Sequence, residues 1–318
     1  MSELKSFSEK QSTVESLDTI WMDGEFIDWD EATIHVLTHG LHYGTGVFEG
    51  VRCYDTEDGP AIFRWGDHLD RLYGSAQSFD IELPYTPEEL TKATRELIDR
   101  QHLDDCYIRP IVFYGYDHLG LNPTGSPIRT AIAAWPFGAY LRDDGLENGV
   151  DVTVSNWRQF ASSQVPTNAK MTGGYVNSVL ANLEARQGGY DEAILLTPDG
   201  TVAEGPGECL FLVSDNKLHT PALSEGVLPS ITRESVIRIA RDLGYTVHHE
   251  STISLDKLET ADELFFAGTA AEITPIRSVN DIAVGNGTKG PVTDEIQSRF
   301  FDIVARRTDD YGEWFTLV

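Results

Sequence analysis

One segment divides this sequence. Residues 138–149 (G-A-Y-L-R-D-D-G-L-E-N-G) are rich in glycine and charge, and apolar strand-like runs alternate with helical patterns on both sides. Such segments are typical of domain boundaries. We therefore expect a small N-terminal domain over 20–137, a linker over 138–149 and a larger C-terminal domain over 150–318, both domains of mixed α/β structure. Residues 1–19 are polar and lack the apolar region of a signal peptide, so we expect a flexible tail.

Local signals place the main elements of each half. Asp23-Gly24 between apolar residues predicts a hairpin, and Thr86-Pro87-Glu88-Glu89 opens a helix with a capping box. Residues 106–115 alternate as a strand, which puts Tyr107 and Arg109 on one face. We also expect helices over 67–78, 175–186 and 228–244 and from near Thr293, strands over 130–137 and 263–273, and a hairpin over 193–204. The apolar face of the helix over 175–186 consists of Val176, Val179, Leu180 and Leu183.

The charge composition restricts the partners of the chain. It has 51 acidic and 24 basic residues and a net charge of −27, whereas nucleic acids and anionic membranes both need a basic face. We therefore expect neither partner, and no segment approaches the length of a membrane span. Only seven basic residues are lysines and the acidic residues are spread along the chain, which indicates adaptation to high salt. An ordinary acidic cytosolic protein is the alternative.

Cysteine and histidine spacing disfavours metal and disulfide motifs. Cys53, Cys106 and Cys209 are far apart in the sequence and lack C-x-x-C spacing, so we expect neither a disulfide framework nor a zinc site, and the cytoplasm is the simplest compartment. His39 and His42 lie three residues apart, but no third ligand has usable spacing. We expect these histidines to be structural and the site to hold no metal.

The stretch 165–178 (V-P-T-N-A-K-M-T-G-G-Y-V-N-S) holds a single charged residue, Lys170, just before a Gly-Gly pair and a helical pattern. Such a lysine is unusual in a chain that places its surface charge mainly with Asp, Glu and Arg. A partly buried lysine loses its proton near neutral pH and attacks a carbonyl to form a Schiff base. An ordinary surface lysine is the alternative.

Several other residues have both a functional and a structural interpretation. Glu204 ends a strand before two glycines, where a carboxylate can face a ligand or cap a turn. Ser230 and Thr232 at a helix start, and residues 268–270 after a buried strand, are candidate anion sites. Arg71 can be solvated or can bind phosphate or carboxylate, and Arg109 can form a structural ion pair or meet an anionic ligand. A lysine, a carboxylate and anion sites match the needs of pyridoxal phosphate.

Seven motifs in order strengthen this interpretation. They are Y-G-T-G-V-F-E-G-V-R-C-Y (43–54), H-L-D-R-L (68–72), Y-I-R-P (107–110), V-P-T-N-A-K (165–170), A-E-G-P-G-E (203–208), L-P-S-I-T-R (228–233) and F-A-G-T-A-A-E-I-T-P-I (266–276). Together they resemble the branched-chain amino acid aminotransferases, which are fold type IV pyridoxal phosphate enzymes. The resemblance implies a small α/β domain, a linker and a larger domain with a barrel-like sheet, with the cofactor between the two domains. It also implies a homo-oligomer, either a dimer or a hexamer.

The resemblance assigns roles to individual residues. Lys170 would form the Schiff base and act as the general base, Glu204 would pair with the pyridine nitrogen, and Tyr175 would bond the ring hydroxyl. The phosphate would be held by Arg71, Ser230, Ile231, Thr232, Gly268 and Thr269. The substrate would contact Tyr43, Phe48, Tyr107, Arg109, Phe137, Thr269 and Ala270, with Arg109 on the distal carboxylate of glutamate. Ping-pong transfer of amino groups from leucine, isoleucine or valine to 2-oxoglutarate would follow.

Two positions depart from the family pattern. Phe137 stands where tryptophan is frequent, which would alter pocket width, and Ser230 stands where glycine is frequent, which adds a hydroxyl beside the phosphate. Within the same fold, D-amino acid aminotransferase and aminodeoxychorismate lyase are alternatives. A non-catalytic binding protein of this fold is a third alternative, although the presence of both Lys170 and Glu204 opposes it.

Overall fold

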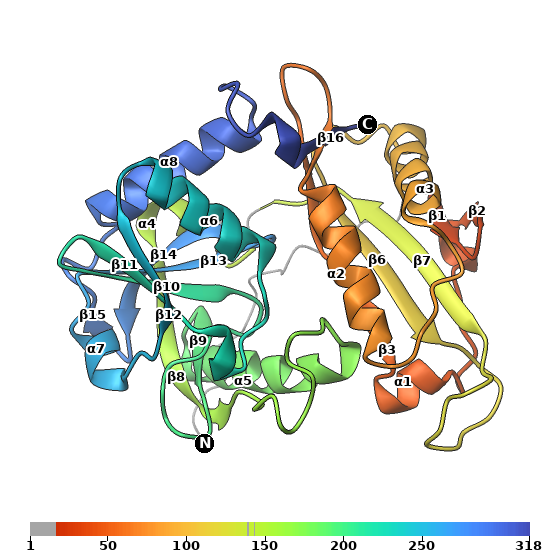
Figure 1. The fold of residues 1–318 in the computed structure, drawn as a ribbon, viewed down its shortest axis with the longest axis horizontal. Helices are drawn as coiled ribbons and strands as arrows, with labels where there is room; N and C mark the ends of the chain where they lie inside the picture. Colours follow the sequence, from red (N-terminus) through yellow and green to blue (C-terminus); the bar gives the residue numbers. More distant parts are fainter. Residues whose placement is uncertain (1–16, 139, 143) are drawn as a thin grey trace, which may run out of the picture.

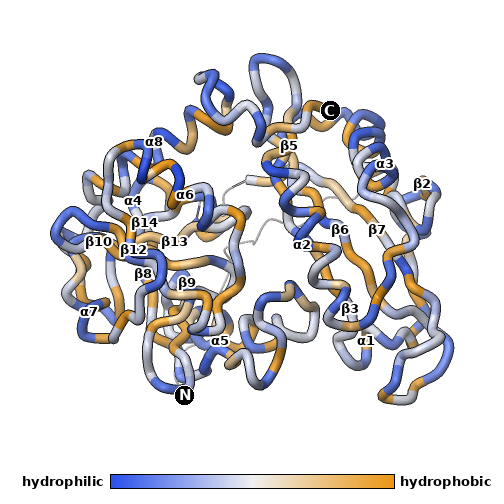
Figure 2. The backbone as a smooth tube through the Cα atoms, in the orientation of Figure 1, coloured by the Kyte–Doolittle hydropathy of each residue, from blue (hydrophilic) through white to orange (hydrophobic). Residues whose placement is uncertain are grey.

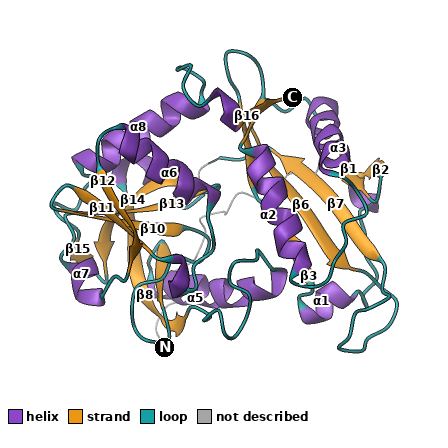
Figure 3. Cartoon of the chain, viewed as in Figure 1, coloured by secondary structure: helices purple, strands orange, loops and turns teal. Residues whose placement is uncertain are grey.

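The computed structural model describes residues 17–138, 140–142 and 144–318, so most of the predicted N-terminal tail lies outside the described residues. In the described part, the chain forms two eight-stranded sheets with helices packed against them, which confirms the expected α/β class (Figure 1, Figure 3). None of the described helices is both long enough and apolar enough to span a membrane.

The first sheet is built mainly from the N-terminal half. Its strands run in the order β16-β5-β4-β6-β7-β1-β2, with β3 paired to β6. Two helices, α2 (Trp65–Gln77) and α3 (Pro87–Arg100), pack on it, and the short α1 (His39–Tyr43) lies at its edge (Figure 1). The strands are β1 (Thr19–Met22), β2 (Glu25–Asp28), β3 (Gly46–Phe48), β4 (Val51–Tyr54), β5 (Ala61–Phe63), β6 (Cys106–Tyr114), β7 (Ile128–Trp135) and β16 (Phe315–Leu317).

The second sheet is built from the C-terminal half, in the order β12-β11-β10-β13-β14-β8-β9, with β15 paired to β14. Its strands are β8 (Val150–Arg158), β9 (Glu192–Leu196), β10 (Cys209–Ser214), β11 (Lys217–Pro221), β12 (Thr246–Ser251), β13 (Glu263–Gly268), β14 (Glu272–Val279) and β15 (Ile282–Ala283). The accompanying helices are α4 (Gly145–Asn148), α5 (Tyr175–Gly188), α6 (Ile231–Asp242), α7 (Leu255–Glu259) and α8 (Pro291–Val304).

The apolar core has separate parts. Under α2 and α3 it includes Leu72 and Leu97, both fully buried. Against α6 and α8 it includes the aromatic side chains Phe211, Phe265 and Phe300, together with Phe63 of the first sheet. Figure 2 shows apolar stretches along the inner strands and hydrophilic residues on the outer loops.

The last strand returns to the first sheet, which the sequence pattern does not predict. In β16, Phe315 pairs with Phe63 of β5, and Trp314 stacks edge-on with the same Phe63 at a centroid distance of 5.6 Å. Residues 138–149 join β7 of the first sheet to β8 of the second and contain α4. Their role as the boundary between two domains stays a prediction.

The predicted local signals correspond to observed features. Asp23 and Gly24 form the β1–β2 turn with φ of 52° and 96°, as a type I′ hairpin needs. Thr86 caps α3 with a complete capping box, and Ser230 caps α6 by accepting the Arg233 N–H at 3.1 Å. The expected hairpin over 193–204 forms, because the Leu195 N–H donates to the Glu204 carbonyl at 2.8 Å and the Ala203 N–H to the Leu195 carbonyl at 2.9 Å. Its second arm is not a regular strand and is joined to β9 by a bridge between Leu196 and Val202.

Helix α5 differs from the expected arrangement. Its predicted apolar face does not cover the core: Val176, Val179 and Leu183 are 58%, 54% and 50% exposed. The helix instead packs through smaller residues, and its buried side chains are Asn177, Ala181 and Ala185. Periodicity identifies the apolar face of a helix but not the surface that covers it.

The two histidines predicted to be structural make hydrogen bonds, and two of the cysteines lie opposite each other on neighbouring strands. His39 bonds Thr45 Oγ1 at 2.7 Å and the Gly120 carbonyl at 2.9 Å, and His42 bonds the Val36 carbonyl at 2.8 Å, which confirms hydrogen-bonding roles. Cys53 and Cys106 are far apart in sequence but lie directly opposite each other on β4 and β6, both as free buried thiols.

Candidate active site

A cavity between the two sheets gathers most of the predicted site residues. It encloses about 560 Å³ of space not filled by atoms, including its opening to solvent. First-sheet elements and α2 contribute Gly50, Tyr107 and Arg71, and all other lining residues follow β8 in the chain. The predicted residues that line it are Arg71, Tyr107, Lys170, Tyr175, Glu204, Ser230, Ile231, Gly268, Thr269 and Ala270.

Lys170 is held from the first sheet although it follows β8 in the chain. Its backbone N–H donates to Ser75 Oγ on α2 at 2.9 Å, and its carbonyl accepts the Phe48 N–H of β3 at 3.1 Å. Its Nζ donates to Tyr175 Oη at 2.5 Å. Burial, reinforced by the positive charge of Arg71, lowers the pKa of Lys170 to about 8. About a tenth of this amine is therefore neutral and nucleophilic at pH 7, far more than for an ordinary lysine.

Glu204 lines the same cavity. One carboxylate oxygen accepts from Gln159 Nε2 and the other from the Leu228 N–H at 3.2 Å. Burial raises the pKa of Glu204 to about 8 in spite of these hydrogen bonds. A cationic partner inside the cavity would hold this carboxyl group ionised, as a protonated pyridine nitrogen does.

Donors for an anion gather at one end of the cavity. Ser230 and Ile231 stand at the start of α6, a helix of 12 residues whose first backbone N–H groups have no partner within the helix. Arg71, Gly268 and Thr269 line the same cavity. Thr232 of the predicted set is 4% exposed and does not line it.

An aromatic wall extends from the cavity along the first sheet. Phe48 lies 4.9 Å from Lys170 Nζ, measured to the ring centroid, and Phe137 lies 4.8 Å from the ring of Tyr107. Gly50 makes room for this wall, because a Cβ there would lie 1.8 Å from Tyr107 Oη. The guanidinium of Arg109 lies over Phe48 at 4.7 Å and donates to Tyr107 Oη at 3.3 Å. Its Nε is buried and has no hydrogen-bond partner among the described residues.

Phe48, Arg109 and Phe137 of the predicted substrate residues are outside the cavity lining but belong to this aromatic wall, whereas Tyr43 belongs to neither. It ends α1, is 43% exposed, and donates from its hydroxyl to the Leu119 carbonyl at 3.4 Å. The sequence motif places Tyr43 near Phe48, but α1 turns its ring onto His39, 4.7 Å away between centroids.

The structure adds residues that sequence reasoning did not single out. Ser75 and Gln159 orient Lys170 and Glu204, as described above. Glu49 contacts both Arg71 and His68. Glu208 lines the cavity at 3% exposure, and one of its oxygens is buried and has no hydrogen-bond partner in the described part of the chain. Only Glu49, His68 and Glu208 lie inside quoted motifs, and that position is the one sequence signal for them.

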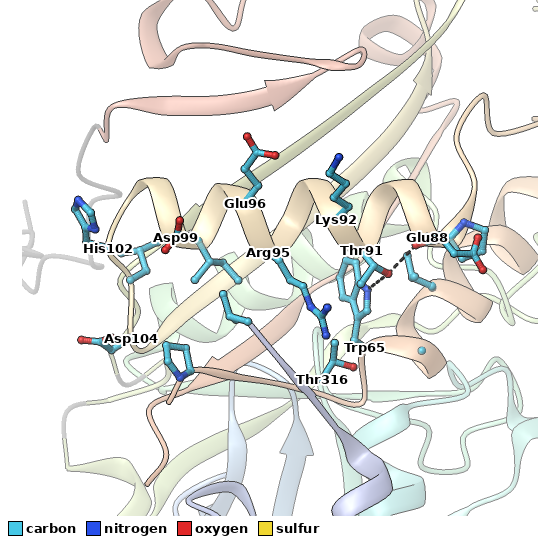
Figure 4. Close-up of a pocket in the computed structure, with 17 residues that line it drawn as sticks. Trp65, Glu88, Thr91, Lys92, Arg95, Glu96, Asp99, His102, Asp104 and Thr316 are labelled. Carbon is cyan, nitrogen blue, oxygen red and sulfur yellow. Dashed lines mark hydrogen bonds between the residues drawn. The ribbon is translucent and has the colours of Figure 1, made fainter. Parts of the chain in front are cut away.

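A larger groove lies elsewhere, between α2, α3 and the C-terminal strand (Figure 4). It spans about 2000 Å³ by the same measure and is wide open to solvent. Trp65 Nε1 donates to Thr91 Oγ1 at 2.7 Å on its wall, and charged side chains of both signs, including Lys92 and Glu96, stand along α3. It contains no paired nucleophile and base, so size alone does not make it the candidate site. Among the described residues no cluster of His, Cys, Asp or Glu is arranged to hold a metal.

The donor set of the inner cavity fits a phosphate-bearing aldehyde with a basic ring nitrogen. Lys170 supplies an amine of lowered pKa, Glu204 a buried carboxyl group, and Arg71 with the start of α6 supplies donors for the phosphate. Gly205 keeps the wall free of side chains, because a Cβ there would lie 2.7 Å from a Glu208 oxygen and 2.8 Å from Phe266.

Comparisons with known proteins agree with this geometry. The family model for amino-transferase class IV matches residues 46–279. The chain is 46% identical over 299 residues to the branched-chain-amino-acid aminotransferase of Pseudomonas aeruginosa, covering 94% of this chain and 97% of that relative.

Two solved structures resemble the whole fold. The branched-chain amino acid aminotransferase of Escherichia coli matches with a TM-score of 0.92 and 45% identity, covering 94% of this chain and 98% of that one. The T.th. branched-chain amino acid aminotransferase with pyridoxamine 5'-phosphate also has a TM-score of 0.92, with 43% identity over 96% of this chain and 99% of that one. The chain therefore belongs to the class IV aminotransferases, as a member of the branched-chain-amino-acid aminotransferase family.

Proposed function

We propose that this protein binds pyridoxal 5'-phosphate and transfers amino groups from branched-chain L-amino acids to 2-oxoglutarate. The observation that carries the proposal is that Lys170 and Glu204 line one cavity, each with its pKa moved to about 8. When bound, the cofactor supplies an electron sink for the electrons released at the substrate Cα. The similar T.th. enzyme, solved with pyridoxamine 5'-phosphate, supports the choice of cofactor.

The residues of the chain then have defined tasks. Lys170 would hold the cofactor through its aldehyde group and, when the substrate amine takes its place, would accept the proton from the substrate Cα as general base. Tyr175 Oη accepts a hydrogen bond from Lys170 Nζ and keeps that amine directed toward the cavity. Glu204 pairs with the ring nitrogen, while Arg71, Ser230, Ile231, Gly268 and Thr269 hold the phosphate, with the Thr232 amide as a further donor. Thr269 and Ala270 bind the substrate α-carboxylate.

The aromatic wall supports the choice of substrates. Phe48, Tyr107 and Phe137 offer an apolar surface for a branched side chain. Arg109 stands beside them, pairs with no carboxylate among the described residues, and would meet the distal carboxylate of glutamate. One pocket can therefore take both kinds of amino donor.

A second copy of the chain supports the site in this proposal. Several apolar side chains on α5 and around α1 are each at least 43% exposed, namely Val36, Leu41, Tyr43, Leu121, Val176, Val179 and Leu183. Apolar surface of this extent is typical of interfaces between subunits. We propose a homo-oligomer that covers α5 and α1, and Tyr43 would then belong to the contact between copies.

The visible absorption spectrum tests the proposed reaction. The purified protein is expected to be yellow with pyridoxal phosphate, to lose this colour with L-leucine, and to regain it with 2-oxoglutarate. A protein that stays colourless when pyridoxal phosphate is added would contradict the assignment of Lys170. Bleaching by D-alanine but not by L-leucine would identify the D-amino acid aminotransferase alternative.

A further inference from the structure

A buried carboxylate stands behind the cavity and has no task in the reaction described above. Glu49 lies between β3 and β4 and is 1% exposed, and its backbone N–H donates to the Pro110 carbonyl at 2.9 Å. One carboxylate oxygen accepts from Arg71 Nε and the other from Arg71 Nη2, both at 2.7 Å. The second oxygen also bonds His68 Nδ1 at 2.7 Å. Arg71 and His68 therefore both bind the carboxylate of Glu49.

The sequence of α2 explains this arrangement. His68 and Arg71 are three residues apart on the helix, so their side chains lie on the same face. Glu49 precedes β4, and the pairing of β4 with β6 fixes its position opposite that face. Bidentate contact between a guanidinium and a carboxylate has a strict geometry, which limits the rotation of the Arg71 side chain.

Glu49, His68 and Arg71 form a triad, and the contacts among these residues determine their charges. Burial opposes ionisation of Glu49, but the charge and hydrogen bonds of Arg71, and then His68, hold the pKa of Glu49 well below its usual range. Burial lowers the pKa of His68, so that the ring is a neutral donor through Nδ1–H. The triad therefore carries one negative and one positive charge at neutral pH.

The remaining donors of Arg71 are directed by these contacts. Arg71 Nη1 donates to the Pro229 carbonyl at 2.9 Å, next to the start of α6. Three of the five N–H groups of the guanidinium are thus occupied by the protein, which leaves two. Arg71 lines the cavity together with Ser230 and Ile231, so these two N–H groups stand beside the free backbone amides of α6.

We propose that Glu49 is a positioning residue that fixes Arg71 for the phosphate of the cofactor and offsets the charge of Arg71 beside Lys170. The inference deepens the proposed function and rests on it. The two charges have opposite effects on Lys170: the charge of Arg71 lowers the pKa of Lys170, whereas the charge of Glu49 raises it. Removing the Glu49 charge while keeping its shape would therefore release Arg71 from its fixed position, which affects only a ligand with a phosphate, and would lower the pKa of Lys170 further, which affects both aldehydes alike.

The test compares two ligands that differ only in the phosphate. Binding of pyridoxal phosphate and of pyridoxal is measured by absorbance for the unaltered protein and for Glu49→Gln. Because Glu49→Gln loses hydrogen bonds to a charged group, we expect it to weaken the affinity for pyridoxal phosphate by roughly 10- to 100-fold. The affinity for pyridoxal should change by no more than about threefold. The matched control is Glu96→Gln, which breaks a surface pair with Arg100 on α3 and should change neither affinity.

A double variant separates positioning from general stability. In an Arg71→Gln background, Glu49→Gln should cause no further loss of pyridoxal phosphate, because both act through the same guanidinium. Equal losses for both ligands, or additive losses in the double variant, would overturn the proposal. If Glu49→Gln does not fold, His68→Gln, which leaves the bidentate pair intact, should show a few-fold loss confined to the phosphate ligand; a loss shared by both ligands would refute it.

The same measurements distinguish this inference from the proposed function. An unaltered protein that binds no pyridoxal phosphate would reject the proposed function and this role together. An unaltered protein that binds it, with a Glu49→Gln variant of equal affinity, would reject the role of Glu49 alone.

Discussion

Replacing Lys170 by methionine should stabilise the cofactor-free protein near neutral pH while abolishing transamination. Methionine is unbranched and close in length to lysine, so it fills the same space beside Phe48 and Tyr175 without a charge. The gain arises because the cavity lowers the pKa of Lys170 from 10.5 to about 8, chiefly by burial. Keeping a protonated amine in this place therefore costs folding free energy.

The size of the effect follows from the shift in pKa. The difference between 10.5 and about 8 is about 2.5 units, and each unit corresponds to about 1.36 kcal/mol, which gives roughly 3 kcal/mol. Between these two values the unfolded chain binds more protons than the folded chain, so the stability of the unaltered protein rises with pH through this window. The cost in folding free energy of burying the protonated amine is fully present below pH 8 and disappears above pH 10.5. Loss of the bond to Tyr175 offsets about 1 kcal/mol, so the net gain near neutral pH is roughly 2 kcal/mol.

Urea unfolding of both proteins, with the cofactor removed, measures this difference. Comparing the two free energies of unfolding at the same pH cancels the titration of all other groups. The variant should be more stable at pH 7 and slightly less stable above pH 10.5, where only the lost hydrogen bond remains. The control is Lys92→Met, at an exposed lysine on α3, which should show no such crossover. A variant that is destabilised equally at both pH values would refute the reasoning.

Three further predictions concern other parts of the chain. Ser230→Ala removes the N-cap of α6 and should lower the free energy of unfolding by about 1 kcal/mol and weaken the binding of pyridoxal phosphate. Unchanged urea unfolding would contradict the stabilising role of this cap. Val179→Asp places a charge in the exposed apolar face of α5 and should reduce the mass measured by light scattering, whereas an unchanged mass would exclude this face from the subunit interface. Because the net charge is −27, the melting temperature should rise from low to molar potassium chloride, and a steady fall would reject adaptation to salt.

Sequence patterns predict those parts of the site that have a local signal. Lys170 stands out because lysine is scarce and its window holds no other charge, and the family resemblance then points to Arg71, Tyr175 and Glu204. All four residues line one cavity. The capping residues Thr86 and Ser230 are predicted for the same reason, since a cap depends on neighbours within a few positions.

Contacts between distant parts of the chain are not predictable in this way. The bond from the Lys170 N–H to Ser75 Oγ joins residues 95 positions apart, and the bond from Gln159 to Glu204 joins residues 45 positions apart. Nothing near Ser75 or Gln159 in the sequence indicates a partner. The opposition of Cys53 and Cys106 likewise depends on the register between β4 and β6. Tertiary packing and strand register determine these pairings, and the local secondary-structure propensity of the residues does not predict them.

The position of Lys170 has a consequence for how the site can assemble. Its main chain is bonded on both sides to first-sheet elements, through Ser75 of α2 and Phe48 of β3, although Lys170 itself follows β8. Glu204 and the start of α6 belong instead to the part of the chain built around the second sheet. A shift between the two sheets would therefore displace the amine relative to the carboxyl group that lines the same cavity. The buried bond from Tyr54 of β4 to Glu272 of β14, 3.0 Å long, opposes such a shift. The catalytic pair thus requires both sheets to be folded and packed together, and the C-terminal strand β16, paired with β5, joins them a second time.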